Sequence, residues 1–341
     1  MNDKKNINIY DIAKISGVST ATVSRVMNNS PKVTEKTKAK VMAAIEQCGY
    51  TPNIFAQGLG LNSMHTIGIL VPSIADLYMS NAVAHIEDIL HNAGYDCILH
   101  CSGYSAKQKE THIQLLLNKK IDALILVGST YAGSEDTTHN TDYIKQAAKR
   151  VPVFIINGLV NGDNIYCTAS NDYQAAYDVT SALIRDGREQ ILFLTDSKSY
   201  SANQKKNGYL DALRNQGKTV DESKIIHTVN SVYTVKDMLT ENEQLSFDSI
   251  FATDDAMAIG AIKYAISKNL HMPNDLAIVG YNNSTLCVCS EPELSSVDNK
   301  IEQVCQDTCN RLIEILQGNT DIPNQSIINC SLIQRGTTNF E

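Results

Sequence analysis

The sequence contains no run of about 18 apolar residues, the length that a membrane-spanning helix needs. Its first ten residues, MNDKKNINIY, include lysines but no apolar segment of the kind that directs secretion. We therefore expect neither a contact with a membrane nor export, and we place the protein in the cytoplasm.

The common sequence motifs of enzymes are also absent. The chain has no G-x-S-x-G, no H-E-x-x-H, no Walker loop and no G-x-G-x-x-G. Asp254 and Asp255 are adjacent, but within TDDAMAIGA they fit the start of a helix, whose positive end favours carboxylates. A sugar-processing enzyme would need a catalytic pair, and a transport receptor would need a signal peptide. We therefore expect no catalytic residue and no cofactor.

The nine cysteines show no spacing that is typical of a metal site. Three pairs lie close together in the sequence, namely Cys97 with Cys101, Cys287 with Cys289, and Cys305 with Cys309. An odd number scattered among apolar residues, without a secretion signal, argues against a disulfide framework. We expect reduced thiols that are buried as small hydrophobic side chains, and no bound metal.

The charge is unevenly distributed over the 341 residues, which are enough for two or three domains. Residues 1–60 contain eight Lys and Arg against four Asp and Glu, a formal charge of +4. The remaining residues carry −12, which gives the total of −8. A small basic head on a large acidic body predicts a nucleic-acid contact that is confined to the head.

Within the head, the residue pattern predicts three short helices. The first has an apolar face formed by Ile9, Ile12, Ala13 and Ile15. Gly17 ends it, and Ser19 is placed to cap a second helix through Asn28 that buries Val23 and Val26. Thr34 and Gly49 bracket a third helix over residues 35–47. Two short helices joined by a glycine turn are typical of a helix-turn-helix motif, here over about residues 9–28.

The outward face of the second helix suits the major groove of double-stranded DNA. Its residues are short except for one arginine: Thr20, Ala21, Thr22, Ser24, Arg25 and Asn28. Arg25 can make the bidentate contact that guanine favours. Hydroxyl groups of Tyr10, Ser19, Thr22 and Ser24 can donate to phosphates. From the residues alone, a helical bundle with a merely solvated polar face is the alternative.

The segments IYDIAKISGVSTATVSRVMNN and VTEKTKAKVMAAIEQCGYTPN resemble the headpiece of the LacI/GalR family of bacterial transcriptional regulators. This resemblance implies that Thr20 and Ala21 select the operator and that Arg25 contacts bases. Tyr10, Asn28 and Asn53 would then be supporting DNA contacts. The resemblance divides the chain into a DNA-binding headpiece (residues 1–50), a hinge helix (51–62) and an effector-binding and dimerisation domain (63–341).

The hinge segment departs from the family pattern. Leu59 matches the leucine that, in the family, enters the minor groove and kinks the DNA. Gln57 and Gly58 replace the usual arginine and serine, and Gly60 follows. Each glycine costs a helix about 1 kcal/mol relative to alanine. We expect a hinge helix that is weak in isolation and folds only on DNA.

Strand-like and helix-like segments alternate along the body. The strand-like segments are HTIGILVPSI, DCILHCSG, IDALILVGS, VPVFIIN and NIYCTAS, and then EQILFLTDS, FDSIFATDD and LAIVGYNN. This alternation predicts an α/β body of two similar doubly wound parallel-sheet lobes, preceded by the small all-α headpiece. The resemblance implies a fold like that of periplasmic sugar-binding proteins. The chain would pass from one lobe to the other near residues 161, 292 and 323. Lobe 1 would hold residues 63–161 and 293–323, and lobe 2 the residues 162–292 and 324–341.

Ligands of open α/β sheets bind beyond the carboxyl ends of the strands. The loops PSIADLYMS, SNDYQ, SYSANQKK, TDDAM and GYNNS are predicted there and are rich in hydrogen-bonding side chains. The resemblance implies effector contacts at Asp172, Lys205, Thr253 and Asn282, with apolar walls at Tyr78 and Ile301. Ordinary loop capping is the alternative role for each of them.

Two of these positions depart from many sugar-responsive relatives, which carry arginine in place of Lys205 and aspartate in place of Asn282. Lysine offers a compact ammonium charge where arginine would offer a planar guanidinium with several donors. Asparagine lacks the charged carboxylate acceptor that aspartate would provide. A pocket altered in this way is expected to bind a different sugar, to bind sugar weakly, or to answer to another signal.

We therefore predict a repressor of carbohydrate-utilisation genes that binds a pseudo-palindromic operator as a homodimer. A sugar or sugar phosphate between the lobes would act as its effector. The alternative is a catabolite-control type of regulator whose corepressor is a phosphorylated carrier protein. The tetrameric relatives carry a leucine-heptad tail, and this chain ends in LIQRGTTNFE, so we expect a dimer.

Overall fold

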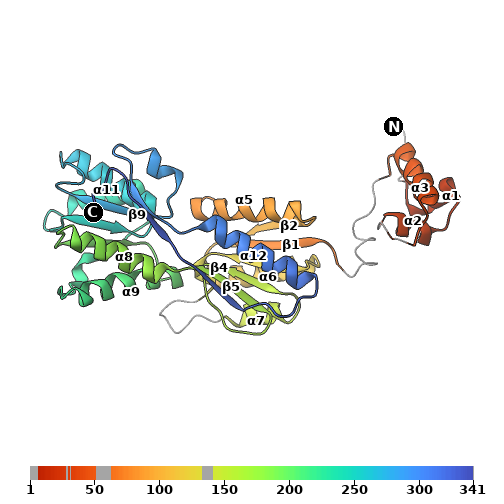
Figure 1. The fold of residues 1–341 in the computed structure, drawn as a ribbon, viewed down its shortest axis with the longest axis horizontal. Coiled ribbons are helices and arrows are strands. Elements are labelled where there is room, and N and C mark those ends of the chain that lie inside the picture. Colours follow the sequence, from red (N-terminus) through yellow and green to blue (C-terminus); the bar gives the residue numbers. More distant parts are fainter. Residues whose placement is uncertain (1–6, 28–29, 31, 51–62, 133–140, 341) are drawn as a thin grey trace. The chain divides into compact units, whose positions relative to one another are not determined.

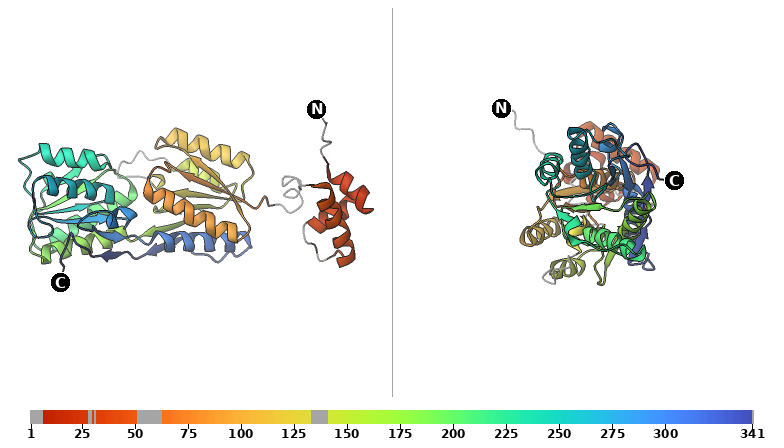
Figure 2. Two further views of the ribbon diagram at one scale, coloured as in Figure 1. Left: turned by 90° about the horizontal axis from the view of Figure 1, so that it is seen from above. Right: turned by 90° about the vertical axis from the view of Figure 1, so that its left-hand side faces the viewer.

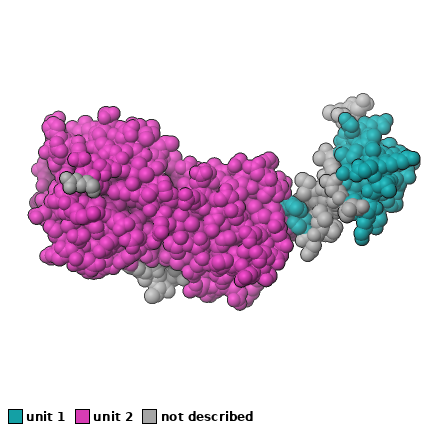
Figure 3. Space-filling model, viewed as in Figure 1, with its two compact units in different colours: residues 1–66 teal, residues 67–341 magenta. Residues whose placement is uncertain are grey.

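The computed structural model describes residues 7–27, 30, 32–50, 63–132 and 141–340. The chain divides into two compact units, residues 1–66 and 67–341 (Figure 3). The predicted hinge helix lies outside the described residues, together with three of the predicted DNA contacts, Asn28, Asn53 and Leu59. No helix among the described residues is long and apolar enough to span a bilayer.

The first unit contains the three predicted helices. They are α1 (Ile9–Ser16), α2 (Thr20–Met27) and α3 (Glu35–Cys48). Gly17 and Gly49 end α1 and α3 in the left-handed conformation, with φ values of 64° and 58°. Thr34 caps α3 by accepting a hydrogen bond from the Thr37 amide. The core consists of Ile12, Ala13, Val23, Val26, Val41 and Ala44.

The prediction that Ile15 belongs to the buried apolar face of α1 is wrong. Ile15 is 51% exposed, whereas Ser16 is buried. The buried face of α1 continues from Ile12 to the residue four positions later, as the helical repeat requires. The Ser16 hydroxyl satisfies its hydrogen-bonding capacity there by donating to the carbonyl oxygen of Ile12 at 2.6 Å.

The second unit consists of two α/β lobes, each built on a six-stranded sheet (Figure 1). The first lobe has the strand order β11-β5-β4-β3-β1-β2. Its elements are β1 (Thr66–Val71), α5 (Leu77–Asn92), β2 (Asp96–Cys101), α6 (Ala106–Asn118), β3 (Ala123–Val127), η1 (Ser129–Tyr131), α7 (Asp142–Ala148), β4 (Val153–Ile156), β5 (Ile165–Ser170), α12 (Ile301–Leu316) and β11 (Gln325–Ile328).

The second lobe has the strand order β12-β10-β9-β8-β6-β7, in which β12 runs antiparallel to β10. Its elements are α8 (Asp172–Arg185), β6 (Ile191–Thr195), α9 (Tyr200–Asn215), η2 (Glu222–Lys224), β7 (Ile225–His227), α10 (Val232–Glu241), β8 (Ser249–Ala252), α11 (Asp255–Ser267), β9 (Ala277–Tyr281), η3 (Thr285–Val288), β10 (Ser295–Asp298) and β12 (Ser331–Ile333). The predicted pair of similar lobes with parallel sheets is confirmed.

Helices cover both faces of each sheet (Figure 2). In the first lobe, α5 and α12 pack on one face and α6 and α7 on the other. Alternate residues of one strand enter the two cores: Ile125 faces α5 and α12, while Leu124 and Leu126 face α6 and α7. In the second lobe, α10 and α11 cover one face and α8 and α9 the other.

The predicted crossing points between the lobes are wrong by several residues. The chain crosses after Ser170, after Asp298 and after Ile328, because β5 and β11 belong to the first sheet and β10 to the second. The strand β5 lies parallel to β4 although only residues 157–164 connect them. The dark-blue segment in Figure 1 shows the third crossing, between β11 and β12.

Hydrogen bonds tie the three crossings to one another. The Ser170 hydroxyl donates to the carbonyl oxygen of Asn299 at 2.7 Å. The Asn171 side-chain amide donates to Oδ1 of Asn329 at 3.0 Å. The segments that join the lobes are therefore linked as one bundle.

All nine cysteines are free thiols. Cys167, Cys287, Cys305 and Cys309 are buried as predicted, whereas Cys101 and Cys289 are exposed, contrary to the prediction. Burial raises the pKa of the Cys287 and Cys309 thiols to about 12, which makes both chemically inert. The described residues contain no group of three or more His, Cys, Asp or Glu side chains that could hold a metal ion.

Candidate functional site

The helix α2 presents a face of small side chains and one arginine. Ala21 and Arg25 are exposed, whereas Thr20, Thr22 and Ser24 are half-buried. The neighbouring Tyr10 on α1 is 73% exposed. Short side chains let a helix backbone approach base edges closely, and Arg25 is the long donor on this face.

Ser19 has a local structural role that the sequence predicts. Its hydroxyl oxygen accepts a hydrogen bond from the Thr22 amide at 3.2 Å and lies 2.9 Å from the Thr22 hydroxyl. These contacts cap the N-terminus of α2, where backbone amides lack partners within the helix. The capped end carries partial positive charge, which suits a phosphate group.

In the second unit, two adjoining cavities lie between the lobes, with volumes of about 110 and 440 Å³. Their walls come from residues beyond the carboxyl ends of strands in both sheets, as predicted for an open α/β fold. The first lobe contributes Asp76, Tyr78, Tyr104, Ser129, Thr130 and Asn157. The second lobe contributes Asp196, Ser199, Lys205, Asn230, Thr253, Asp254 and Asn282.

Five of the six predicted effector contacts line this cleft. Tyr78, Lys205, Thr253 and Asn282 line the smaller cavity, and Ile301 lines the larger one. Asp172 is the exception, because it lies behind the cleft with 1% exposure and is not among the lining residues.

Asp172 instead supports the lysine of the cleft from behind. Its carboxylate accepts a hydrogen bond from the Tyr281 hydroxyl at 2.6 Å. The Lys205 ammonium lies 3.7 Å from the centroid of the Tyr281 ring and donates to the carbonyl oxygen of Thr253 at 3.4 Å. The aromatic ring thus separates the buried cation from the buried anion and contacts both.

The sequence analysis missed several residues that line the cleft, notably Asp76, Asp196 and Asn157. Asp76 and Asp254 cap α5 and α11 by accepting hydrogen bonds from the amides of Met79 and Ala256. The predicted cap at Asp254 is correct, but the carboxylate that caps the helix also faces the cleft. For Asp196 and Asn157, a polar residue directly after a strand was the signal available in the sequence, whereas Asp76 directly precedes α5.

Several buried polar atoms of the cleft have no hydrogen-bond partner among the described residues. They are the Tyr78 hydroxyl, Asn157 Oδ1, Asn230 Oδ1 and Thr253 Oγ1. A buried polar group without a partner costs about 1–3 kcal/mol, and a ligand that pairs with it recovers part of that free energy. Such a set of separate donors and acceptors fits a ligand with several hydroxyl groups.

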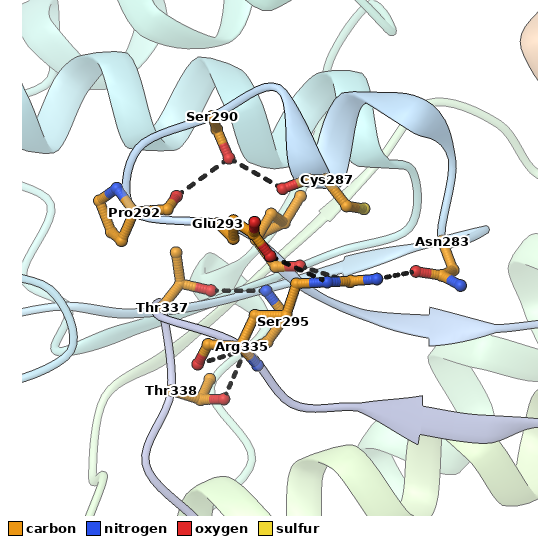
Figure 4. A network of polar contacts seen from close by, with 10 residues as sticks. Asn283, Cys287, Ser290, Pro292, Glu293, Ser295, Arg335, Thr337 and Thr338 are labelled. Atoms are coloured by element: carbon orange, nitrogen blue, oxygen red, sulfur yellow. Dashed lines mark hydrogen bonds and ion pairs between the residues drawn. The ribbon is translucent and has the colours of Figure 1, made fainter.

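Asn282 joins the cleft to its supporting residues. Its amide donates to Asp254 at 2.9 Å, and its Oδ1 accepts from the Asn299 amide at 2.8 Å. The following residue, Asn283, accepts a hydrogen bond from Arg335 at 2.7 Å. Figure 4 shows that Arg335 lies between Asn283 and Glu293, so the C-terminal segment holds the turn that carries Asn282.

Asp254 is expected to make stability depend on pH. Burial, with repulsion from Asp255, raises the pKa of Asp254 from 3.8 to about 7. The folded state therefore holds this proton more tightly than the unfolded state, and the free energy of unfolding falls as pH rises from 4 towards 7. Asp254→Asn removes this titration. Its stability relative to the wild type should rise between pH 5 and 8 by about 1–4 kcal/mol, measured by thermal unfolding.

Asp221→Asn is the control for this prediction. Asp221 is exposed, and hydrogen bonds from Ser223 lower its pKa below 3.8. It is ionised throughout the range from pH 5 to 8, so its effect on stability should not change with pH there. A difference between Asp254→Asn and the wild type that stays constant over this range would contradict the assignment.

Comparisons with known proteins agree with both parts of the structure. Residues 8–53 match the model of bacterial regulatory proteins of the lacI family. Residues 64–336 match the model of periplasmic binding proteins and the sugar binding domain of the LacI family. The two matches cover the helix-turn-helix unit and both lobes.

Among curated relatives, an HTH-type transcriptional regulator of Lachnoclostridium phytofermentans is 44% identical over 98% of this chain and 100% of its own length. Catabolite control protein A of Priestia megaterium is 33% identical over 86% of this chain and 87% of its own length.

Solved structures share the fold. The Lac repressor dimer bound to operator and the anti-inducer ONPF has a TM-score of 0.86 at 24% identity, over 98% of this chain and 99% of that one. The CelR–cellobiose complex has a TM-score of 0.71 at 22% identity, over 97% of this chain and 100% of that one. The predicted resemblance is confirmed: the chain belongs to the LacI family of bacterial regulatory proteins and is a DNA-binding transcriptional regulator.

Proposed function

We propose that this regulator represses genes of carbohydrate use and responds to a hydroxylated small molecule bound between its lobes. The observation that carries the proposal is the set of unpaired polar atoms in the cleft, provided by Tyr78, Asn157 and Thr253. The protein would act on bacterial DNA in the cytoplasm and would catalyse no reaction on its effector.

The DNA contacts of the proposal lie on α2 and its surroundings. Tyr10, Thr20, Ala21, Thr22, Ser24 and Arg25 form the reading surface, with Ser19 at the helix cap. One such headpiece reads too few base pairs to select a site in a genome, and a homodimer on a pseudo-palindrome doubles the site. The dimeric, operator-bound state of the Lac repressor structure supports this arrangement.

In the switching mechanism that we propose, effector binding changes the angle between the lobes. The effector can do so only through its different affinity for the two lobe arrangements. The change would alter the spacing of the paired hinge segments, and with it the access of Leu59 to the minor groove. Asn28 and Asn53 would support the bound state.

Arg25→Ala is expected to weaken binding to the operator by about 1–3 kcal/mol and to relax the preference at one base pair of each half-site. An operator selected in vitro by the wild-type protein, titrated in a mobility-shift assay, provides the measurement. Lys40→Ala is the control, because it removes a positive charge from α3 of the same unit. Lys40→Ala should weaken binding less than Arg25→Ala does, and by the same factor for all DNA sequences. If both variants lowered affinity by the same factors across the tested sequences, base reading by Arg25 would be refuted.

The effector is tested by a thermal-shift screen of the full chain against monosaccharides, disaccharides and sugar phosphates. A ligand at 100 times its Kd stabilises the protein by about 2.7 kcal/mol, which raises the melting temperature. The compound that binds should also change operator affinity.

The alternative, a corepressor that is a phosphorylated carrier protein, is favoured by the 33% identity to a catabolite control protein A. A screen without any hit, together with tighter operator binding in the presence of phosphorylated carrier protein, would replace the sugar proposal with this one.

A further inference from the structure

The cleft between the lobes is acidic. Asp76, Asp196 and Asp254 all line the cavities, and they lie in the segments that follow β1, β6 and β8, from both lobes. Among the described lining residues, Lys205 is the one with a positive charge. The lining therefore carries more negative than positive charge.

The charge of Lys205 is already compensated from outside the cavity. Its ammonium lies against the ring of Tyr281, whose hydroxyl donates to the buried carboxylate of Asp172. The second carboxylate oxygen of Asp172 has no hydrogen-bond partner among the described residues, so no other cation neutralises it there. Lys205 thus shares its charge between Asp172 behind the cavity and Asp76 within it, and the three lining carboxylates outnumber the one lining cation.

The hydrogen-bond donors to Asp76 and Asp254 are neutral groups. Asp76 accepts from the Met79 amide at 3.1 Å, and Asp254 accepts from the Ala256 amide and the Asn282 side chain. Burial raises the pKa of Asp76 and repulsion from Asp196 adds to the effect, while the amides of Met79 and Tyr78 and the charge of Lys205 oppose it. The carboxylates are close enough to repel one another, and a cation between them would relieve that repulsion.

We propose that the effector is a hydroxylated ligand with an ammonium group, such as an amino sugar, and that it carries no phosphate. Asp76, Asp196 and Asp254 would hold the ammonium group, while the unpaired atoms of Tyr78, Asn157 and Thr253 would pair with hydroxyl groups. A phosphate in this cleft would face Asp76 and Asp196, with Asp254 partly ionised at pH 7, and Lys205 as the one cation of the described lining. The inference rests on the proposed function and specifies its ligand.

The test compares matched sugars on the full-length protein at pH 7 and low ionic strength, by calorimetry. Each set contains four forms of one sugar: the neutral sugar, its amine, its N-acetylated amine and its phosphate. The glucose set is glucose, glucosamine, N-acetylglucosamine and glucose 6-phosphate, and corresponding sets are built on galactose and mannose. For the sugar that binds, the amine should bind at least about tenfold more tightly than its neutral and phosphorylated forms.

Asp196→Asn isolates the electrostatic contribution. Asp196 is exposed and lines both cavities, so its replacement leaves the fold intact. The variant should lose about tenfold in affinity for the amine and nothing for the neutral sugar. The control is Glu241→Gln, which removes one exposed charge from the end of α10, outside the cavity lining.

The outcomes separate the two proposals. Equal or tighter binding of the neutral or phosphorylated form overturns the inference and leaves the proposed sugar effector standing. An Asp196→Asn variant that keeps the preference for the amine also overturns the inference. Absence of binding by every sugar in every form overturns the proposed effector, and the inference with it.

Discussion

Val23→Asp is expected to abolish operator binding while leaving the effector-binding unit folded. Val23 is fully buried in the six-residue core that holds α1, α2 and α3 together. An unpaired carboxylate buried there costs several kcal/mol. A unit of this size has a free energy of unfolding of only about 0.05–0.15 kcal/mol per residue, so the substitution is large enough to unfold it.

The expected loss of operator affinity is at least about 1,000-fold, since only non-specific binding remains. Mobility shift measures this loss, and the thermal unfolding of residues 67–341, a separate compact unit, should be unchanged. Met42→Asp is the matched control, because it adds the same charge at a half-exposed position of α3. If Val23→Asp bound operator as well as Met42→Asp does, the core of the unit would not be what presents α2 to DNA.

Gly208→Val should lower the stability of the second lobe by about 3 kcal/mol or more. Gly208 lies on α9 where this helix crosses α8. A Cβ atom at this position would lie 2.2 Å from the carbonyl oxygen of Tyr173 and 3.0 Å from the amide nitrogen of Tyr177. Both are backbone atoms of a helix, which cannot move aside as a flexible side chain would.

The substitution also separates stability from ligand binding. Lys205 lies one turn before Gly208 on the same helix, so a displaced α9 should weaken effector binding in any protein that remains folded. Asn207→Val is the control, because Asn207 is exposed on the same helix and asparagine and valine have similar helix propensities, so this replacement should change stability little. Equal melting temperatures for the two variants would show that α8 and α9 do not need the close approach at Gly208.

The helices of the first unit could be predicted because each has a local signal at its ends. Ser19, Thr34 and the glycines at 17 and 49 act within one turn of the helices that they delimit. The face of α1 was harder to predict at its last turn, because Ile15 and Ser16 both lie within the helical repeat of Ile12. Packing against the other two helices, which is not local, selects between them.

The lobe boundaries could not be predicted from local signals. Two parallel strands normally need a connection of about a dozen or more residues, which usually includes a helix. The short connection from β4 to β5 breaks this rule, and the family resemblance implied a change of sheet near residue 161. Only the pairing of Ile165 with Val153 in one sheet shows that the crossing comes later.

The location of the cleft could be predicted, but the roles of its residues could be predicted only in part. The strand ends identify the loops around Lys205, Thr253 and Asn282. The loop of Asp172 is equally close to a strand end, yet this side chain turns away from the cavity to the Tyr281 hydroxyl. Which way a side chain points depends on residues distant in sequence, here 109 positions away.

The three linked crossings limit how the lobes can move. A single connecting segment would act as a swivel and allow rotation about any axis. Three segments that are hydrogen-bonded to one another, through Ser170 with Asn299 and Asn171 with Asn329, resist both twisting and sliding. Bending about the line through the crossings is the motion that these contacts oppose least. We therefore expect the opening angle between the lobes to be the coordinate that a compound bound in the cleft changes.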